Sequence, residues 1–337
     1  MLMKKLISVL MIGGLLIVSA CSDGSSADGE DGNEEATYKL KVGTALTESD
    51  PIYQGIEEFE KNVEEQTNGD VDIEIMGSGS LGEDSDILEQ AKAGANVAVL
   101  VDSGRLAELV PEMGILSAPY IVDNYDEANT VVQSDLFKDL EEKLVEQESL
   151  DILSFNWYQG DRHILSNKKV EKPEDLKGLK LRTPEAPVWL ESIKAMGGSP
   201  TGMAWSEVYP GISQGVIDGA EAQLPAVYGA NLYEVVDHIS KTSHFQLITG
   251  IVAGADWMAT LPEDYQDIIY EEAAKAGEEA SYNTEESLEE FEQDIKDEGV
   301  EIHEVDKDLF KEQTESVYQK FEGYEDLREE INKILEK

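Results

Sequence analysis

Arginine is the scarce residue of this chain, and its placement predicts anion recognition. The 26 basic residues include only four arginines: Arg105, Arg162, Arg182 and Arg328. A planar guanidinium can hold a carboxylate or phosphate through two parallel hydrogen bonds, which the ammonium of lysine cannot do. Arg182 lies inside the strand pattern LKLRTP, where a cation is costly unless it is paired, and Arg162 follows another expected strand through a Gln159-Gly160 turn. Both could instead join surface ion pairs with the abundant acids, which is all that we expect of Arg328.

A second pattern, in residues 71–104, has the spacing of a nucleotide-binding loop. A Gly-x-Gly-x-x-Gly sequence ending at Gly82 follows an alternating strand pattern, and Asp102 comes 20 residues later. The helix expected next begins with three carboxylates, Glu83, Asp84 and Asp86. These carboxylates occupy the helix end that would otherwise attract a pyrophosphate. We therefore interpret the glycine loop as close backbone packing at the edge of a lobe, and we expect no nucleotide cofactor.

The histidines form no recognisable catalytic or metal-binding pattern. They are His163, His238, His244 and His303, and no two of them have His-x-x-x-His or His-Glu-x-x-His spacing. One Gly-x-Ser-x-Gly match occurs, GISQG at residues 211–215, but no strand pattern leads directly into it as a nucleophile elbow requires. The motifs therefore predict no metal, no cofactor and no enzymatic activity.

The elements that must position the arginines follow an α/β order. Strand patterns at 38–46, 71–76 and 97–101 alternate with helical patterns at 51–69 and 83–94, an order that builds a parallel sheet. A strand at 150–158 precedes a second α/β stretch, residues 162–244. Residues 262–299 predict a long amphipathic helix or helix pair, followed by a strand at 300–305 and two helical segments. We expect two α/β lobes, joined by crossing strands and capped by long helices.

The N-terminus predicts export. Residues 1–21 carry Lys4 and Lys5, then an apolar stretch that ends in small residues and the single cysteine, Cys21, an arrangement typical of a bacterial lipoprotein signal peptide. Cys21 could be a chance cysteine, but we interpret it as the lipid-bearing first residue of the mature protein. Residues 22–36 form an acidic Gly/Ser tether that cannot bury enough surface to fold. We expect an extracytoplasmic protein, anchored by lipid to the outer face of the cell membrane or held in a periplasm, without crossing the membrane.

The charge balance excludes a class of partners. The chain has 72 acidic residues against 26 basic ones, so its surface repels nucleic acid and anionic lipid. We interpret this as solvation in a salty or alkaline exterior. Specific cation binding is the alternative, but acidic stretches such as EESLEEFEQD lack the ligand spacing and the glycine of a calcium loop.

One long segment carries a family resemblance. Residues 173–223, PEDLKGLKLRTPEAPVWLESIKAMGGSPTGMAWSEVYPGISQGVIDGAEAQ, resemble the signature region of the solute-binding proteins of TRAP (tripartite ATP-independent periplasmic) transporters, the DctP family. The resemblance continues through GSGSLGEDSDILEQAKAG and covers roughly residues 38–321. It implies a two-lobed, periplasmic-binding-protein-like (Venus flytrap) α/β fold with long helices bridging the lobes. Lobe I would take mainly residues 37–160 and lobe II mainly 161–246, while 247–337 would supply a return strand, the bridging helix and the C-terminal helices.

The resemblance also implies a binding site. Arg182 matches the arginine that holds the ligand carboxylate in this family, Arg162 matches a second arginine, and Trp205 matches an aromatic residue that packs on the ligand. On the other lobe, Asp102 matches an acidic position after a strand. Trp157 is a further candidate for stacking on the ligand, since it ends the strand that leads to Arg162.

Three positions stay open at this stage. Many family members have an asparagine where this chain has Ala222, so either the neighbouring Gln223 takes over its role or the pocket is reshaped. Arg105 could contact the ligand or form a structural ion pair. We expect Trp189 to belong to the core rather than to the site.

The function implied is that of a monomeric, non-enzymatic receptor that captures a small organic acid and delivers it to a TRAP permease. The acid and the coupling ion of the permease are left open. Two alternatives are a sensor with a signalling membrane partner and an exported enzyme that acts on an organic acid in the same cleft.

Overall fold

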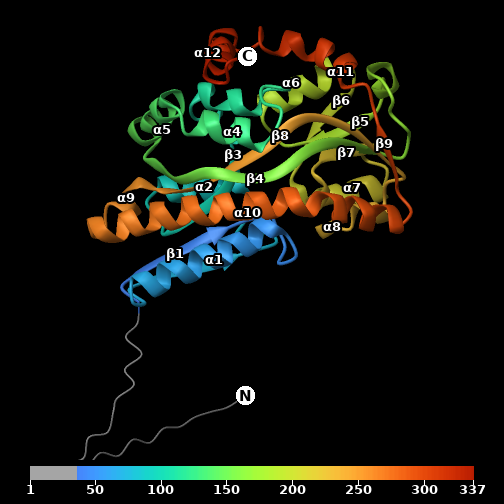
Figure 1. The fold of residues 1–337 in the computed structure, drawn as a ribbon. Coiled ribbons are helices and arrows are strands. Elements are labelled where there is room, and N and C mark those ends of the chain that lie inside the picture. The colour runs from blue at the N-terminus through green and yellow to red at the C-terminus, as the bar shows by residue number, and fades with distance from the viewer. Residues whose placement is uncertain (1–35) are drawn as a thin grey trace, which may run out of the picture. The chain divides into compact units, whose positions relative to one another are not determined.

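The computed structural model describes residues 36–337 (Figure 1). The predictions for the signal peptide, Cys21 and nearly all of the tether lie outside the described residues. Among residues 36–337, every helix is too short or too polar to cross a membrane.

The first lobe begins with three parallel strands. β1 (Tyr38–Gly43) pairs with both β2 (Val71–Met76) and β3 (Val97–Asp102), and the helices α1 (Pro51–Gln66) and α2 (Asp84–Lys92) connect them. The predicted β-α-β-α-β order and the parallel pairing are both confirmed. Asp50 fixes the start of α1, because its side chain accepts a hydrogen bond of 2.9 Å from the backbone nitrogen of Ile52.

The second lobe repeats the arrangement with shorter strands. β5 (Lys180–Thr183) pairs in parallel with β6 (Ser199–Gly202) and β7 (Gly219–Ala222). The helices α6 (Pro187–Ala195), α7 (Val208–Ser213) and α8 (Leu224–Gly229) lie along the chain between and after these strands.

Two 17-residue strands join the lobes. β4 (Leu150–Ser166) and β8 (His238–Gly254) are antiparallel neighbours in one sheet of order β2-β1-β3-β8-β4-β7-β5-β6, with β9 (Glu301–Glu304) added beside β8. β8 also pairs with β3 and β4 with β7, so each long strand is shared between the lobes. The turn predicted at Gln159-Gly160 is instead a register shift inside β4, with Gly160 at φ 104°.

A single long helix spans both lobes. α10 (Glu263–Asp297) has 35 residues and is therefore about 50 Å long, and it runs along β4 while α1 packs against it (Figure 1). Two glycines permit this close packing. A Cβ on Gly55 of α1 would come within 2.4 Å of the Cβ of Ala280, and one on Gly277 would come within 2.4 Å of the side-chain oxygen of Asn156.

The remaining elements cover the sheet. The helices are α3 (Ser103–Leu106), α4 (Tyr125–Val132), α5 (Asp135–Glu148), α9 (Ala255–Met258), α11 (Lys307–Thr314) and α12 (Tyr324–Ile334). Short 3₁₀ segments lie at Pro111–Ser117, Pro173–Leu176, Trp205–Glu207, Leu232–Glu234 and Glu315–Val317.

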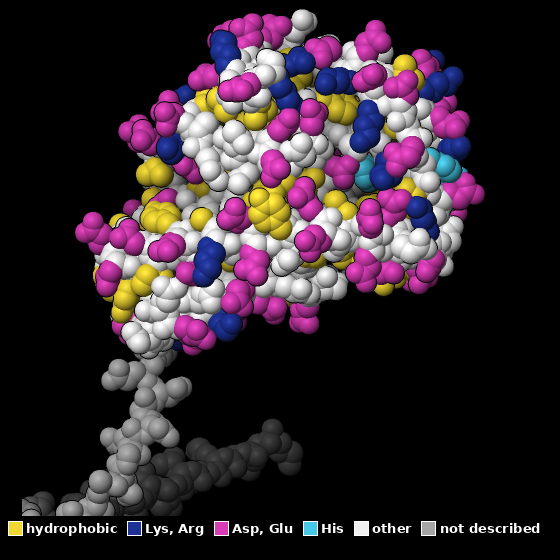
Figure 2. Space-filling model, in the orientation of Figure 1, with side chains coloured by type: hydrophobic (Ala, Val, Ile, Leu, Met, Phe, Trp, Pro, Cys, Tyr) yellow, Lys and Arg dark blue, Asp and Glu magenta, His cyan; other side chains and the backbone are white. Residues whose placement is uncertain are grey.

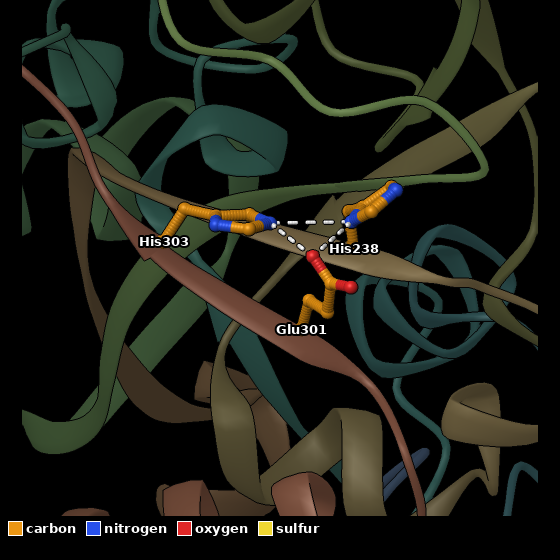
Figure 3. A group of neighbouring side chains, drawn as sticks. All are labelled: His238, Glu301 and His303. Atoms are coloured by element: carbon orange, nitrogen blue, oxygen red, sulfur yellow. Dashed lines mark hydrogen bonds and ion pairs between the residues drawn. The ribbon is translucent and has the colours of Figure 1, made fainter.

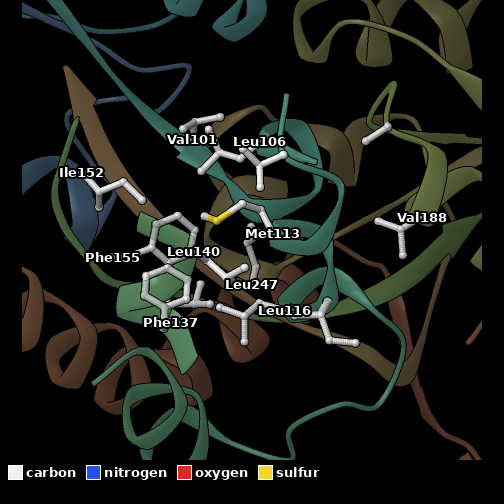
Figure 4. Packing of buried hydrophobic residues seen from close by; sticks show 14 of the residues in the cluster. Val101, Leu106, Met113, Leu116, Phe137, Leu140, Ile152, Phe155, Val188 and Leu247 are labelled. Carbon is white, nitrogen blue, oxygen red and sulfur yellow. The ribbon is translucent and has the colours of Figure 1, made fainter. Parts of the chain in front are cut away.

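The apolar core continues to the edge of the candidate site. Phe137 and Leu140 of α5 belong to the same buried cluster as Ile152 and Phe155 of β4, and the rings of Phe137 and Phe155 lie 5.1 Å apart (Figure 4). Leu247 of β8 is part of this cluster and also lines the main cavity. The site therefore rests on close-packed side chains, which hold its polar groups in place.

The glycine loop between β2 and α2 combines tight packing with turns. A Cβ on Gly77 would lie 2.6 Å from Cε2 of Tyr53, which is the close approach predicted from the sequence. Gly79 and Gly82 instead supply backbone φ angles of 70° and 130°, which other residues rarely adopt.

Carboxylates are spread over the surface. Figure 2 shows Asp and Glu side chains scattered across the whole visible face of the folded unit, including the long helix, with fewer Lys and Arg side chains between them. This distribution matches a chain with a formal net charge of −46.

Candidate ligand-binding site

A cavity between the lobes brings together most of the predicted site residues. It surrounds about 580 Å³ of space, including the part that opens to solvent. Its lining residues come from both lobes and from the crossing strands: Thr44, Ala45, Leu46, Asp84, Leu100, Asp102, Arg105, Gln159, Arg162, Arg182, Pro184, Trp189, Trp205, Gln223, Ala226, Leu247 and Thr249.

Among the residues that the structure describes, Arg182 is a buried cation without a carboxylate partner. It lies on β5, opposite Thr201 and Ala220, and is 2% exposed. Its Nε donates a 2.9 Å hydrogen bond to the carbonyl oxygen of Met203, and its guanidinium carbon lies 5.2 Å from the ring centre of Trp205. Within residues 36–337 it forms no ion pair, and neither of its terminal nitrogens donates a hydrogen bond. Burial, and then the nearby charge of Arg162, lowers the pKa of Arg182 to about 9.

Arg162 has the opposite arrangement, because its charge is already balanced. Its Nε and Nη2 donate to the two carboxylate oxygens of Glu221, with Nη2 at 3.0 Å from Oε1. Nη1 donates to Oε1 of Gln223 at 2.8 Å, and the guanidinium lies 4.7 Å from the ring centre of Trp189. Glu221 is fully buried in β7 and also accepts a hydrogen bond of 2.9 Å from Thr183. The Arg162–Glu221 pair is thus close to neutral as a unit.

Arg105 and Asp102 form a second balanced group on the first lobe. Nη1 of Arg105 pairs with Oδ2 of Asp102, and its Nε lies 3.5 Å from Oδ2 of Asp84. Oδ1 of Asp102 accepts from the backbone nitrogen of Arg105, which caps α3. Burial raises the pKa of Asp84. The structure therefore gives Arg105 an ion pair, and places that ion pair in the wall of the cavity.

The tryptophans separate into two environments. Trp205 and Trp189 line the cavity, although Trp189 is 1% exposed and also belongs to the core cluster in which we expected it. Trp157, predicted to stack on a ligand, lies outside the cavity. It is fully buried, its Nε1 donates to Oγ of Ser154 at 2.7 Å, and it fills the space left by the missing side chains of Gly55 and Gly277. These two glycines direct Trp157 into the core between α1 and α10.

Gln223 belongs to a chain of hydrogen-bonded side chains in the wall of the cavity. Its Oε1 accepts from Arg162, and its Nε2 donates to Oε1 of Gln159 at 2.8 Å. Gln159 donates in turn to Oγ1 of Thr249 at 3.1 Å. Ala222, where the family often has asparagine, is fully buried in β7.

Sequence reasoning missed three polar groups of the site. Glu221 was available as the only charged residue in the short strand GAEA, where a carboxylate needs a partner. The sequence pattern shows Asp84 only as a charge at the start of a helix. It predicts a turn at Gln159, which instead lies in β4.

An acidic crevice adjoins the cavity. It shares Asp84 and Arg105 with the cavity and is otherwise lined by Glu83, Ser85, Leu88, Glu89, Glu108, Leu109, Glu185, Met203 and Ala204. A solute that reaches the arginines from this side passes several carboxylates.

A two-lobed α/β fold whose crossing strands carry a buried polar cavity defines a binding protein of the periplasmic type. Residues 42–324 match the family described as bacterial extracellular solute-binding protein, family 7 (DctP), and the chain belongs to this family. The resemblance found in the sequence is confirmed.

Solved structures of TRAP periplasmic solute-binding proteins match nearly the whole described chain. One from Escherichia fergusonii, in an apo open form, is 42% identical with a TM-score of 0.78, and the match covers 88% of this chain and 99% of that one. One from Actinobacillus succinogenes with bound L-galactonate is 32% identical with a TM-score of 0.84, covering 88% and 99%. One from Ochrobacterium anthropi with bound L-fuconate is 33% identical with a TM-score of 0.84, covering 88% and 100%. The greater likeness to the two ligand-bound proteins, despite their lower identity, agrees with a closed conformation in which the site residues are buried.

Proposed function

We propose that this protein captures a polyhydroxylated monocarboxylate of the sugar-acid class, holds its carboxylate on Arg182, and delivers it to a TRAP-type permease. The observation that carries the proposal is the charge balance of the cavity. Arg162 and Arg105 are neutralised by Glu221, Asp102 and Asp84, whereas Arg182 has no carboxylate partner within residues 36–337. A ligand carboxylate would supply the missing anion through charge-assisted hydrogen bonds, each contributing about 1.5–3 kcal/mol.

The same balance favours one carboxylate over two. Asp84 and Asp102 lie in the wall of the cavity on the first lobe. Their oxygens can accept hydrogen bonds from hydroxyl groups, but they would repel a second carboxylate. Trp205, beside Arg182, offers an apolar face to the carbon chain of a ligand. The bound L-galactonate and L-fuconate of the two similar proteins are ligands of this kind.

Family membership, rather than the cavity, supports the proposal of delivery to a permease. The lipid anchor at Cys21 and the monomeric state remain part of the proposal, because they rest on the sequence alone.

Calorimetric titration of the purified protein tests the choice of ligand. The panel holds L-galactonate, L-fuconate, D-glucuronate, sialic acid and succinate, each with the unmodified protein and with Arg182→Met. We expect one or more sugar acids to bind, succinate to bind more weakly, and binding to be lost in Arg182→Met. A preference for succinate, or undiminished binding by Arg182→Met, would contradict the proposed clamp.

Two further measurements separate transport from its alternatives. Uptake of the labelled ligand into proteoliposomes that contain the TRAP permease of the same cell should depend on this protein. Conversion of the bound acid to a product, followed by mass spectrometry, would instead favour the exported enzyme.

A further inference from the structure

A cluster of two histidines and a glutamate lies away from the ligand cavity, at the edge where β9 joins the sheet. His238 is on β8, and Glu301 and His303 are two residues apart on β9. Residues two apart on a strand share one face, and the parallel register places Glu301 opposite His238 and His303 opposite Ser240. Figure 3 shows the three side chains converging on one point, with the Glu301 carboxylate between the two rings.

The distances within the cluster match a metal coordination sphere. Nδ1 of His238 lies 3.2 Å from Nε2 of His303, and Oε2 of Glu301 lies 3.7 Å and 3.5 Å from these two atoms. Zinc bonds to histidine nitrogen and carboxylate oxygen are about 2.0–2.2 Å long, so the ligand atoms of a tetrahedral site lie about 3.4 Å apart. All three separations are within 0.3 Å of that value.

We propose that His238, Glu301 and His303 bind Zn²⁺ or a similar divalent transition metal, with water in the fourth position. Two imidazoles and one carboxylate suit zinc and its neighbours, whereas calcium and magnesium require oxygen ligands. The rings are mostly buried, with side-chain exposures of 21% and 16%, while Glu301 is 69% exposed, which leaves an open side for water. Lys169, whose charge acts on His303, is itself paired with Glu171 at 2.7 Å.

The position of the cluster indicates a structural role for the metal. None of its residues lines the ligand cavity. β9 has only four residues, pairs with β8 alone among the described strands, and follows directly after α10. A metal that crosslinks β8 and β9 would fasten the end of the long helix to the sheet. The prediction of no metal from sequence missed this cluster because 65 residues separate His238 from His303.

The test is a titration of the EDTA-treated, full-length protein with Zn²⁺ alone, followed by calorimetry at 0.5 M NaCl, where non-specific attraction to surface carboxylates is screened. The variants are His303→Ala and Glu301→Gln. The matched control is Glu304→Gln, which removes the same charge from the same strand but lies outside the cluster, paired with Lys241 at 3.0 Å. A second titration, with Co²⁺ and the unmodified protein, reports four-coordinate geometry through the intensity of its visible absorption and needs no substitution.

We expect one Zn²⁺ per chain and a rise in Tm. Loss of a direct ligand in His303→Ala should weaken binding by more than the roughly 10–100-fold that loss of an outer-shell partner costs. Glu304→Gln should bind Zn²⁺ within a few-fold of the unmodified protein. The proposal is overturned if the unmodified protein binds no Zn²⁺, if His303→Ala binds it equally well, or if bound Co²⁺ shows only the weak visible absorption of a six-coordinate ion.

Discussion

Replacing Arg182 and Arg162 with methionine, one at a time, should change the stability of the closed conformation in opposite directions. Both arginines are at least 96% buried in the same cavity, with 2% and 4% exposure, but of the two only Arg162 has a carboxylate partner within the described part of the chain. Burial holds the pKa of Arg182 at about 9, well below its ordinary value, and since a pKa difference of one corresponds to about 1.4 kcal/mol, its charge costs several kcal/mol in the closed conformation.

The magnitudes follow from this difference. Arg182→Met removes an uncompensated charge and should raise the free energy of unfolding by about 1–4 kcal/mol, which is the range seen when buried ionic groups are replaced by apolar ones. Arg162→Met leaves Glu221 fully buried without its partner and should lower the free energy of unfolding by about 3–5 kcal/mol. For the ligand, loss of two charge-assisted hydrogen bonds in Arg182→Met should weaken binding at least about 100-fold.

Urea unfolding at pH 7.5, followed by circular dichroism, measures the stabilities, and calorimetry with the best sugar acid of the panel measures the affinity. Arg328→Met is the control, since Arg328 pairs with Glu315 on the surface and should change stability by less than about 1 kcal/mol. If Arg182→Met destabilises the protein as much as Arg162→Met does, then the charge of Arg182 is compensated and the assignment of its role is refuted.

Three smaller changes test other parts of the structure. Burial raises the pKa of Asp50 from 3.8 to about 6, so the ionised carboxylate destabilises the fold at higher pH. In urea unfolding, Asp50→Asn should therefore raise the free energy of unfolding by up to about 3 kcal/mol at pH 7.5 and by almost nothing at pH 4. An equal gain at both pH values would exclude the charge as the cause. Gln223→Ala removes an acceptor from Arg162 and should weaken sugar-acid binding about tenfold by calorimetry; unchanged affinity would show that the site does not need it. Gly55→Ala would place a Cβ 2.4 Å from that of Ala280 and should lower the free energy of unfolding in urea by about 1–3 kcal/mol, whereas the same change on a solvent-facing helix raises it. A higher free energy of unfolding would mean that α1 can move away from α10.

The fold could be predicted where local patterns decide it. Alternation in 38–46 and 71–76 and the helical spacing between them correctly predict the parallel strands β1, β2 and β3. The length of β4 could not be predicted, because Gln159-Gly160 has the composition of a turn and becomes a bulge only when β8 pairs on both sides of it. Long-range strand pairing, which the local sequence does not encode, decides between the two outcomes.

The site could be predicted only in part, and mainly through the family resemblance. The residues that the resemblance predicts correctly to line the cavity are Arg182, Arg162, Trp205, Asp102 and Gln223. Which arginine is free for a ligand could not be predicted, since that depends on Glu221 facing Arg162 across the pair of β4 and β7. Trp157 was a candidate for the site only because it precedes Arg162 in the sequence, and its side chain is instead buried in the core.

If the ligand is a sugar acid as proposed, the acidic surface has a kinetic consequence for its capture. A sugar acid that approaches a chain of net charge −46 is repelled before it reaches Arg182, most of all at the crevice lined by Glu83, Glu108 and Glu185. Salt shortens the range of this repulsion, from about 30 Å at 0.01 M to about 3 Å at 1 M, while the contact inside the closed cavity is screened much less. Stopped-flow association should therefore become faster as salt is added, and a rate that falls with salt would show that attraction by the arginines dominates. On this reasoning the Coulomb barrier of the surface makes ligand association fast at high salt concentration and slow at low salt concentration.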